Sequence, residues 1–299
     1  MLQTLKNWTL PIAMLLGLLL YPWLVEAAFL MPWLLFGMLL FSFCNVSPRS
    51  VKFSSLHVWL LLIQLVGCIV VYSLLALFNP VVAQGTFICV LAPTAAAAAV
   101  ITGMLGGSVP FLTSYVIFCN IGVSVAAPIL FSFIGTNREL PFWESVWNIC
   151  QEVFPLLILP LLCAWGLQYF VPRVHAWMVR RSKIAFYLWA VSLTIVTGVT
   201  VSFLVEQGGS AYREEWIIAG ITLAVCVGQF LLGRRLGRHY GDPVSAGQGL
   251  GQKNTVLAIW MSHIYLDPIA SVGPAAYILW QNIINSWQLW RKRKNEIKQ

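Results

Sequence analysis

Charged side chains are scarce in this chain of 299 residues. Only 9% of the residues are charged, whereas 59% are apolar and the mean hydropathy is +0.81. A soluble globular domain carries about 25% charged residues, so this chain has too few to cover a water-facing surface. A membrane span needs about 20 apolar residues. Spans and short loops therefore take up nearly the whole length, the bilayer is the main solvent, and no sizeable soluble domain fits.

The sequence also lacks the common motifs of catalysis. It contains no HExxH, no GxSxG and no Walker loop, and no two acids lie together within one apolar segment. Its seven cysteines form no CxxC pair and lie mostly in apolar runs, where cysteine acts as a small hydrophobe. We therefore expect no enzyme activity, no cofactor and no metal site. The missing ATP-binding motif favours a secondary transporter or facilitator over a pump.

Ten apolar segments can be placed along the chain as transmembrane helices. They cover approximately residues 8–25, 29–46, 56–78, 81–105, 110–134, 153–171, 184–205, 216–232, 244–264 and 269–290. Between spans five and six, Trp143 and Trp147 stand beside Glu144, which is typical of a short interfacial helix.

The net charge of +8 is distributed unevenly over this topology. With the N-terminus placed inside, 15 of the 18 lysines and arginines fall in inside segments, including the loops around Arg49, Arg180 and Arg235. Arg138 and Arg213 fall outside, and most acids do so too. The positive-inside rule then predicts cytoplasmic termini in the cell's inner (plasma) membrane. Because the basic tail serves as an anchor, we expect no nucleic-acid partner.

Two predicted spans contain segments that interrupt a regular helix. Span four holds Pro93 and Thr94 before five alanines, and span nine holds Gly247, Gly249 and Gly251. Proline supplies no N–H to a helix, and clustered glycines weaken one. Each interruption is in the fourth of five spans, and two tandem five-span units insert with opposite orientations. Matched interruptions in inverted halves indicate a transporter's central site; a simple kink and a glycine packing seam are the alternatives.

The predicted fold class is therefore an all-α membrane protein with ten transmembrane helices in two inverted five-helix repeats. The first repeat covers residues 1–134 and the second covers residues 153–290. A connecting interfacial helix at 135–152 joins them, and residues 291–299 form a basic cytoplasmic tail.

Lys253 is the only basic residue that this topology places within a span. It lies about ten residues past Pro243, which is about mid-membrane at 1.5 Å per residue. A charge there costs about 2.5–3.5 kcal/mol on insertion scales, so its side chain needs partners inside the protein. Interhelical hydrogen bonding is the alternative role for the other intramembrane polar residues. The candidate substrate or ion site comprises Lys253, Gln248, Gln252, Asn254, Gln64, Asn120, Ser124, Pro93 and Thr94.

Several of these segments resemble the bile acid:sodium symporter superfamily. The similar motifs are Ala92-Pro93 with the following small residues, Ala126-Ala127-Pro128, Gln248 to Asn254 with Leu257-Ala258, Gly273-Pro274-Ala275, and Trp280-Gln281-Asn282. The resemblance implies a panel domain of spans one, two, six and seven. It implies a core domain of spans three to five and eight to ten, in which spans four and nine are broken and cross. Substrate would bind between the domains, and two sodium ions would bind behind the crossing.

The sodium ligands that the resemblance implies are largely missing. Ala98 and Ala99 stand where a serine–asparagine pair is expected, and Gln248 stands where a glutamate is expected. Lys253 replaces an asparagine, whereas Gln252, Gln64, Asn120 and Ser124 match polar positions of the family. A lysine ammonium offers a fixed charge and three donors, so it can replace the ion's electrostatic role. A buried lysine can also release its proton, which leaves proton coupling open.

The sequence thus predicts a secondary transporter of a small organic anion, with a carboxylate or sulfonate as substrate, that works by alternating access without sodium. A cation or proton antiporter-like protein of a related fold is one alternative. A non-transporting membrane sensor or binding protein is another.

Overall fold

A computed structural model describes residues 2–135, 141–206 and 212–296. It is 86% helical, and the described residues include no β-strand, only an isolated bridge between Thr94 and Lys253. The helices are α1 (Leu2–Leu19), α2 (Tyr21–Leu24), η1 (Glu26–Leu30), α3 (Met31–Phe43), η2 (Pro48–Ser50), α4 (Ser55–Ala76), α5 (Pro80–Leu91), α6 (Ala98–Leu105), α7 (Val109–Ile134), α8 (Phe142–Phe170), α9 (Pro172–Arg180), α10 (Ile184–Glu206), α11 (Tyr212–Arg238), α12 (Pro243–Gly251), α13 (Thr255–Tyr265), η3 (Pro268–Ser271) and α14 (Val272–Glu296).

Six helices of the described chain are long and apolar enough to cross a membrane. They comprise the segment Glu26–Phe43 and the helices α4, α7, α8, α10 and α11. Many large apolar side chains on them are exposed, for example Leu62, Phe133 and Leu231. An exposed apolar surface of this extent needs lipid as its solvent. The structure therefore supports an all-α, multi-pass membrane protein.

Helix starts follow local sequence signals. Asn79 caps α5 with its side-chain oxygen, which accepts the N–H groups of Val81 and Val82, and Pro80 follows at the first helical position. Asp242 and Pro243 begin α12 in the same way. Such Asx–Pro pairs satisfy N–H groups that have no partner within the helix and fix the first φ angle.

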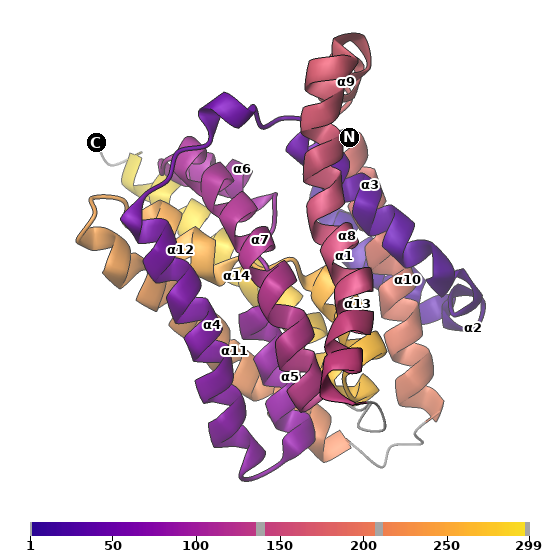
Figure 1. Ribbon diagram of the computed structural model, residues 1–299. Coiled ribbons are helices and arrows are strands. Elements are labelled where there is room, and N and C mark those ends of the chain that lie inside the picture. Colours follow the sequence, from indigo (N-terminus) through magenta and orange to yellow (C-terminus); the bar gives the residue numbers. More distant parts are fainter. Residues whose placement is uncertain (1, 136–140, 207–211, 297–299) are drawn as a thin grey trace.

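The helices pack in two groups (Figure 1). A four-helix group contains α1, α3, α8 and α10, with α10 packed against both α1 and α3. A larger group contains α4 to α7 and α11 to α14, in which α11 packs against α12, α14 and α5. Helix α7 packs against α8, so the two groups are in contact there. The start of α1 and the end of α14 lie at the same end of the bundle, the upper end in Figure 1.

Residues 142–152 depart from the sequence prediction. The separate interfacial helix that was expected there is instead the beginning of α8, which runs unbroken for 29 residues despite Pro155 and Pro160. Trp143 and Trp147 are nevertheless exposed, as an interfacial position requires. Residues 136–140 of the expected connection lie outside the described residues.

Predicted spans four and nine are each broken into two half-helices. Span four stops at Leu91 and resumes at Ala98, as expected from Pro93. Span nine breaks at 252–254, which is later than the predicted position, because Gly249 and Gly251 still belong to α12. These glycines serve close packing: a side chain at Gly251 would overlap the ring of Phe230, and one at Gly247 would overlap Arg234. The glycines of span nine therefore serve helix packing, which was the alternative interpretation. The span is interrupted all the same, just after them.

Candidate functional site

The two breaks meet each other in the interior of the larger group. Thr94 and Lys253 form an antiparallel backbone bridge. The Ala95 N–H donates to the Gln252 carbonyl at 3.1 Å, and the Asn254 N–H donates to the Pro93 carbonyl at 2.8 Å. The interrupted segments of predicted spans four and nine therefore approach each other, with the backbone contacts of span nine at 252–254. Their depth in the membrane stays a prediction. We call residues 92–97 and 252–254 together the crossing.

Side chains from other segments satisfy the carbonyls at the end of α5. A helix leaves its last four carbonyls without partners in the helix, which is costly away from water. Lys253 Nζ donates to the Val90 carbonyl at 2.9 Å. Gln64 Nε2, from α4, donates to the carbonyls of Leu91 and Ala92 at 2.8 and 3.1 Å. The break in span four is thus stabilised by the predicted residues Lys253 and Gln64.

The end of α12 is satisfied in the same way. The Thr94 hydroxyl donates to the Gly249 carbonyl at 2.6 Å, and the Tyr277 hydroxyl of α14 donates to the Gly251 carbonyl at 2.8 Å. The Lys253 N–H donates to Gln281 Oε1 at 2.9 Å, so α14 also fixes the crossing itself. Each half-helix end is therefore held by side chains from the rest of the larger group.

Lys253 is almost fully buried, with 1% of its surface exposed. Its ammonium group lies at the C-terminal end of α5, where the helix dipole places partial negative charge. The ionisable side chains near enough to interact with it are the thiols of Cys68, Cys89, Cys119 and Cys226, and no carboxylate of the described residues is among them. The lysine thus adds a positive charge to the crossing that no described acid neutralises.

The half-helices that begin at the crossing differ in their caps. Asn254 caps α13, since its side-chain oxygen accepts the Leu257 N–H at 3.3 Å. Helix α6 has no side-chain cap at Ala97. Ala97 is exposed, and Ala95 and Ala96 are partly exposed, whereas the residues from 252 to 254 are buried. A ligand that approached the crossing would therefore meet the alanines and the positive N-terminal end of α6.

Three predicted site residues do not join the crossing through any hydrogen bond that the described structure contains. Asn120 donates to Val116 in its own helix, and Ser124 donates to Ile121 in its own helix. Gln248 faces α14 instead, where it donates to Asn285 Oδ1 at 2.9 Å and to Gln288 Oε1 at 3.2 Å.

Buried acceptors remain unsatisfied near the crossing. The side-chain oxygens of Gln252, Asn120 and Gln248 have no hydrogen-bond partner in the described structure. Unpaired buried oxygens cost about 1–3 kcal/mol each, so each favours a donor that comes from outside the protein, such as water. Gln252 is the one of the three that belongs to the crossing.

Sequence reasoning missed Gln229 and Tyr277. Gln229 Nε2, from α11, donates to the Tyr277 hydroxyl at 3.0 Å, and Tyr277 in turn reaches α12. Tyr115 of α7 donates to Gln64 Oε1 at 3.2 Å in a comparable arrangement. Gln229 is a lone polar residue in the middle of an apolar helix, just as Gln64 is, and this signal could have identified it.

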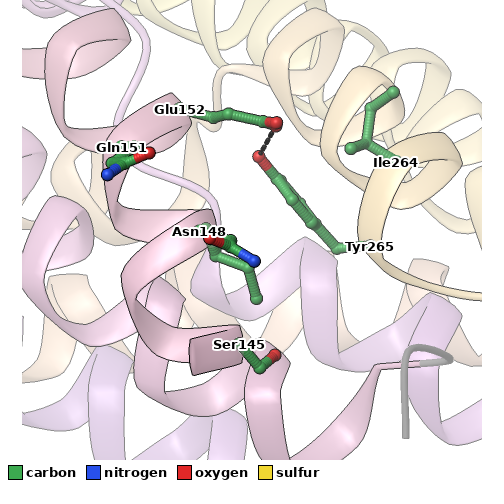
Figure 2. Close-up of a pocket in the computed structure, with 7 residues that line it drawn as sticks. Ser145, Asn148, Gln151, Glu152, Ile264 and Tyr265 are labelled. Atoms are coloured by element: carbon green, nitrogen blue, oxygen red, sulfur yellow. Dashed lines mark hydrogen bonds between the residues drawn. The ribbon is translucent and has the colours of Figure 1, made fainter. Parts of the chain in front are cut away.

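A polar cavity of about 350 Å³ lies between α8 and the end of α13 (Figure 2). Asn148, Gln151 and Glu152 line it from α8. Figure 2 shows Glu152 reaching across to Tyr265 of α13, whose hydroxyl donates to the carboxylate at 2.6 Å. This bond ties the four-helix group to the larger group at the end of the bundle opposite the termini.

Comparison of the sequence with protein-family models and with curated proteins finds no match. The resemblance to the bile acid:sodium symporter superfamily therefore rests on the motifs quoted above, and function has to be argued from the crossing.

Proposed function

We propose that this protein is a ten-span secondary transporter that carries a small organic anion across the plasma membrane by alternating access. The observation that carries the proposal is the crossing, in which two half-helix ends meet and Lys253 adds a buried positive charge. Broken helices that meet inside a bundle are the usual construction of a transporter's central site.

Ten spans account for the helices as follows. Six spans are the long apolar helices, and two more are the broken spans, α5 with α6 and α12 with α13. Helix α1 would be the first span and α14 the last. The broken spans are then fourth in each set of five, and two five-span units in tandem have inverted orientations.

The polar partners support the inverted repeat independently. In the first set of five, Gln64 of the third span bonds with Tyr115 of the fifth. In the second set, Gln229 of the third span bonds with Tyr277 of the fifth. Both tyrosines are fully buried. Both pairs join the third span of a set to the fifth, with the tyrosine as donor in the first pair and as acceptor in the second. A glutamine–tyrosine pair between corresponding spans is what a duplicated unit would leave.

The two helix groups supply the moving parts. The four-helix group corresponds to the panel and the larger group to the core in the resemblance. Alternating access would move one group against the other, because the crossing is bonded within the larger group. The contact between Glu152 and Tyr265 would then close one end of the pathway.

An anion suits the charges at the crossing. The uncapped N-terminus of α6 carries partial positive charge beside the accessible residues Ala95 and Ala97. Lys253 lies behind it without a neutralising acid among the described residues. A carboxylate or sulfonate would be stabilised there by N–H donors and by the field of the lysine.

Sodium does not suit the same place. Lys253 Nζ already occupies the carbonyl end of α5, which is where a cation would be stabilised. Two like unit charges 4 Å apart repel by about 4 kcal/mol at an effective dielectric of 20. We therefore propose sodium-independent transport with Lys253 in place of the ion, and release of the lysine proton offers a route to proton coupling.

A thermal-shift screen tests this function. The purified protein would be heated with carboxylates and sulfonates, in sodium buffer and in potassium or choline buffer at fixed pH. A substrate raises the melting temperature because it binds only the folded state. We expect stabilisation by an organic anion, equal in all three buffers and lost in Lys253→Met. Uptake into proteoliposomes with a saturable sodium requirement would refute the proposed role of Lys253. A screen without any anion-dependent shift would count against the substrate class.

A further inference from the structure

A second cavity, of about 390 Å³, lies at the end of the bundle where α1 begins and α14 ends. It is formed where α6, α11, α12 and α14 converge, and Arg234, Arg291 and Lys292 line it. Gln288 and Asn295 supply amide groups. Three cations around one concave space distinguish this cavity from the crossing and from the cavity at Glu152.

The two arginines have no carboxylate partner among the residues that the structure describes. Arg234 is half-buried and donates to Gln288 Oε1 at 2.8 Å. Arg291 lies over the ring of Trp287, with its guanidinium carbon 5.4 Å from the ring centroid, as in a cation–π pair. Arg234 is close enough to Arg291 and Arg238 to be repelled by both. An anion between the arginines would relieve this repulsion.

Lys292 is oriented toward the same space by α6. Its ammonium donates to the Met104 carbonyl at 2.9 Å, near the C-terminal end of that helix. Gly106, with a φ of 83°, ends α6 in the left-handed conformation and leaves room for the lysine end, which lies 3.4 Å from where a side chain would begin. The cavity is therefore lined by residues of four packed helices, and its basic side chains do not come from an exposed loop.

The position of the cavity indicates the kind of anion. Trp287 and Trp290 are exposed on the same helix, at 52% and 57%. Exposed tryptophans in a membrane protein mark the depth of the lipid headgroups. Guanidinium groups bind phosphate oxygens through paired N–H donors, and basic pockets between transmembrane helices bind anionic headgroups.

We propose that this cavity binds a phosphate group, held by Arg234 and Arg291 with Lys292 beside them. The group belongs to an anionic phospholipid headgroup or to free phosphate. Gln288 Oε1, which accepts from Arg234, also accepts from Gln248 of α12, so the bound group would lie one side chain away from a broken helix.

The test measures binding to the purified full chain in neutral detergent by thermal shift and native mass spectrometry. The probes are short-chain phosphatidylglycerol, short-chain phosphatidylcholine and inorganic phosphate. The test variant is Arg234→Gln with Arg291→Gln. The matched control is Arg180→Gln with Arg181→Gln, which removes two charges from α9 and its end, where Arg181 lies over Trp177 at 5.2 Å.

We expect phosphatidylglycerol to bind more tightly than phosphatidylcholine. Each arginine near the headgroups contributes about 1 kcal/mol, or about fivefold in affinity, so the test variant should bind about 25-fold more weakly. The control should change affinity by less than about twofold, since neither Arg180 nor Arg181 lines the cavity. Competition by inorganic phosphate would identify free phosphate as the ligand, and its failure would identify the headgroup.

Equal weakening in the test and control variants would overturn the proposal, because general attraction to a basic protein end would then explain the binding. Unchanged affinity in the test variant would overturn it as well. If the double variant does not fold, Arg291→Gln alone serves, since Arg291 is exposed and its substitution removes only the contact with the ring of Trp287. The single variant should then weaken phosphatidylglycerol binding about fivefold.

Discussion

Thr94 and Lys253 each cap the helix from which the other one comes. The Thr94 hydroxyl donates to Gly249 in α12, and Lys253 Nζ donates to Val90 in α5, while the two backbones pair directly. The end of α12 thus has a carbonyl whose donor comes from the segment after α5, and the end of α5 has a carbonyl whose donor comes from the segment after α12.

Lys253→Ala should destabilise the protein by about 2–4 kcal/mol, because it leaves the Val90 carbonyl unpaired and opens a cavity. Lys253→Met should cost less, since it fills the space and removes a buried charge. Thermal unfolding in detergent measures both. Lys52→Met is the control: that side chain is exposed, and its loss should change stability by less than about 0.5 kcal/mol. A Lys253→Ala protein as stable as the parent would contradict the capping role.

Gln64→Leu should be more damaging than Asn120→Leu, although both replace a buried amide. Gln64 donates to two carbonyls at the end of α5, so its loss leaves both without a partner. Asn120 donates only to Val116, whose carbonyl is already inside a helix. We expect a difference of about 1–3 kcal/mol in the free energy of unfolding. Equal effects of the two substitutions would show that Gln64 does not support the break.

The two ends of α11 should lie on opposite sides of the membrane. Arg213 and Arg238 are both exposed and mark these ends. With Cys150 and Cys163 replaced by alanine to lower the background, Arg213→Cys should react with an impermeant thiol reagent in intact cells. Arg238→Cys should react only after permeabilisation, because it lies at the proposed cytoplasmic end. The reverse pattern would contradict the topology on which the inverted repeat depends.

Glu152→Gln and Tyr265→Phe should each weaken the tie between the two helix groups. Their bond is 2.6 Å long and joins a carboxylate to a hydroxyl, so a double-mutant cycle should give a coupling of about 1 kcal/mol. Glu144→Gln removes an exposed carboxylate from the same helix and serves as the control. Additive effects of Glu152→Gln and Tyr265→Phe would show that the bond contributes nothing.

The sequence could predict which residues need partners but not which partners they find. Pro93 indicated one break, and a lysine within an apolar span indicated a buried charge, because both follow from the properties of a single segment. The glycines of α12 were ambiguous, since glycine serves both loose backbone and close packing. The packing of Gly251 against Phe230 depends on where α11 lies, which only the tertiary structure determines.

The polar residues illustrate the same limit. Gln64 and Gln248 look alike in the sequence, as each is an amide within an apolar span. The rotation of its helix turns Gln64 toward α5 and Gln248 toward α14. Periodicity within one helix fixes which residues share a face, but it does not fix which neighbour that face meets. The sequence could therefore place the site at the crossing, but it could not predict which of the polar residues take part in it.

The bond between Lys253 and Val90 has a consequence for biosynthesis. The two residues are separated by 163 positions in the chain. At a synthesis rate of about 5–20 residues per second, Val90 leaves the ribosome about 10–30 s before its partner does. During that interval the end of α5 has no lysine to satisfy it, and bare carbonyls are not tolerated in lipid. The end of α5 therefore completes its hydrogen bonds only after most of the second half of the chain has been made.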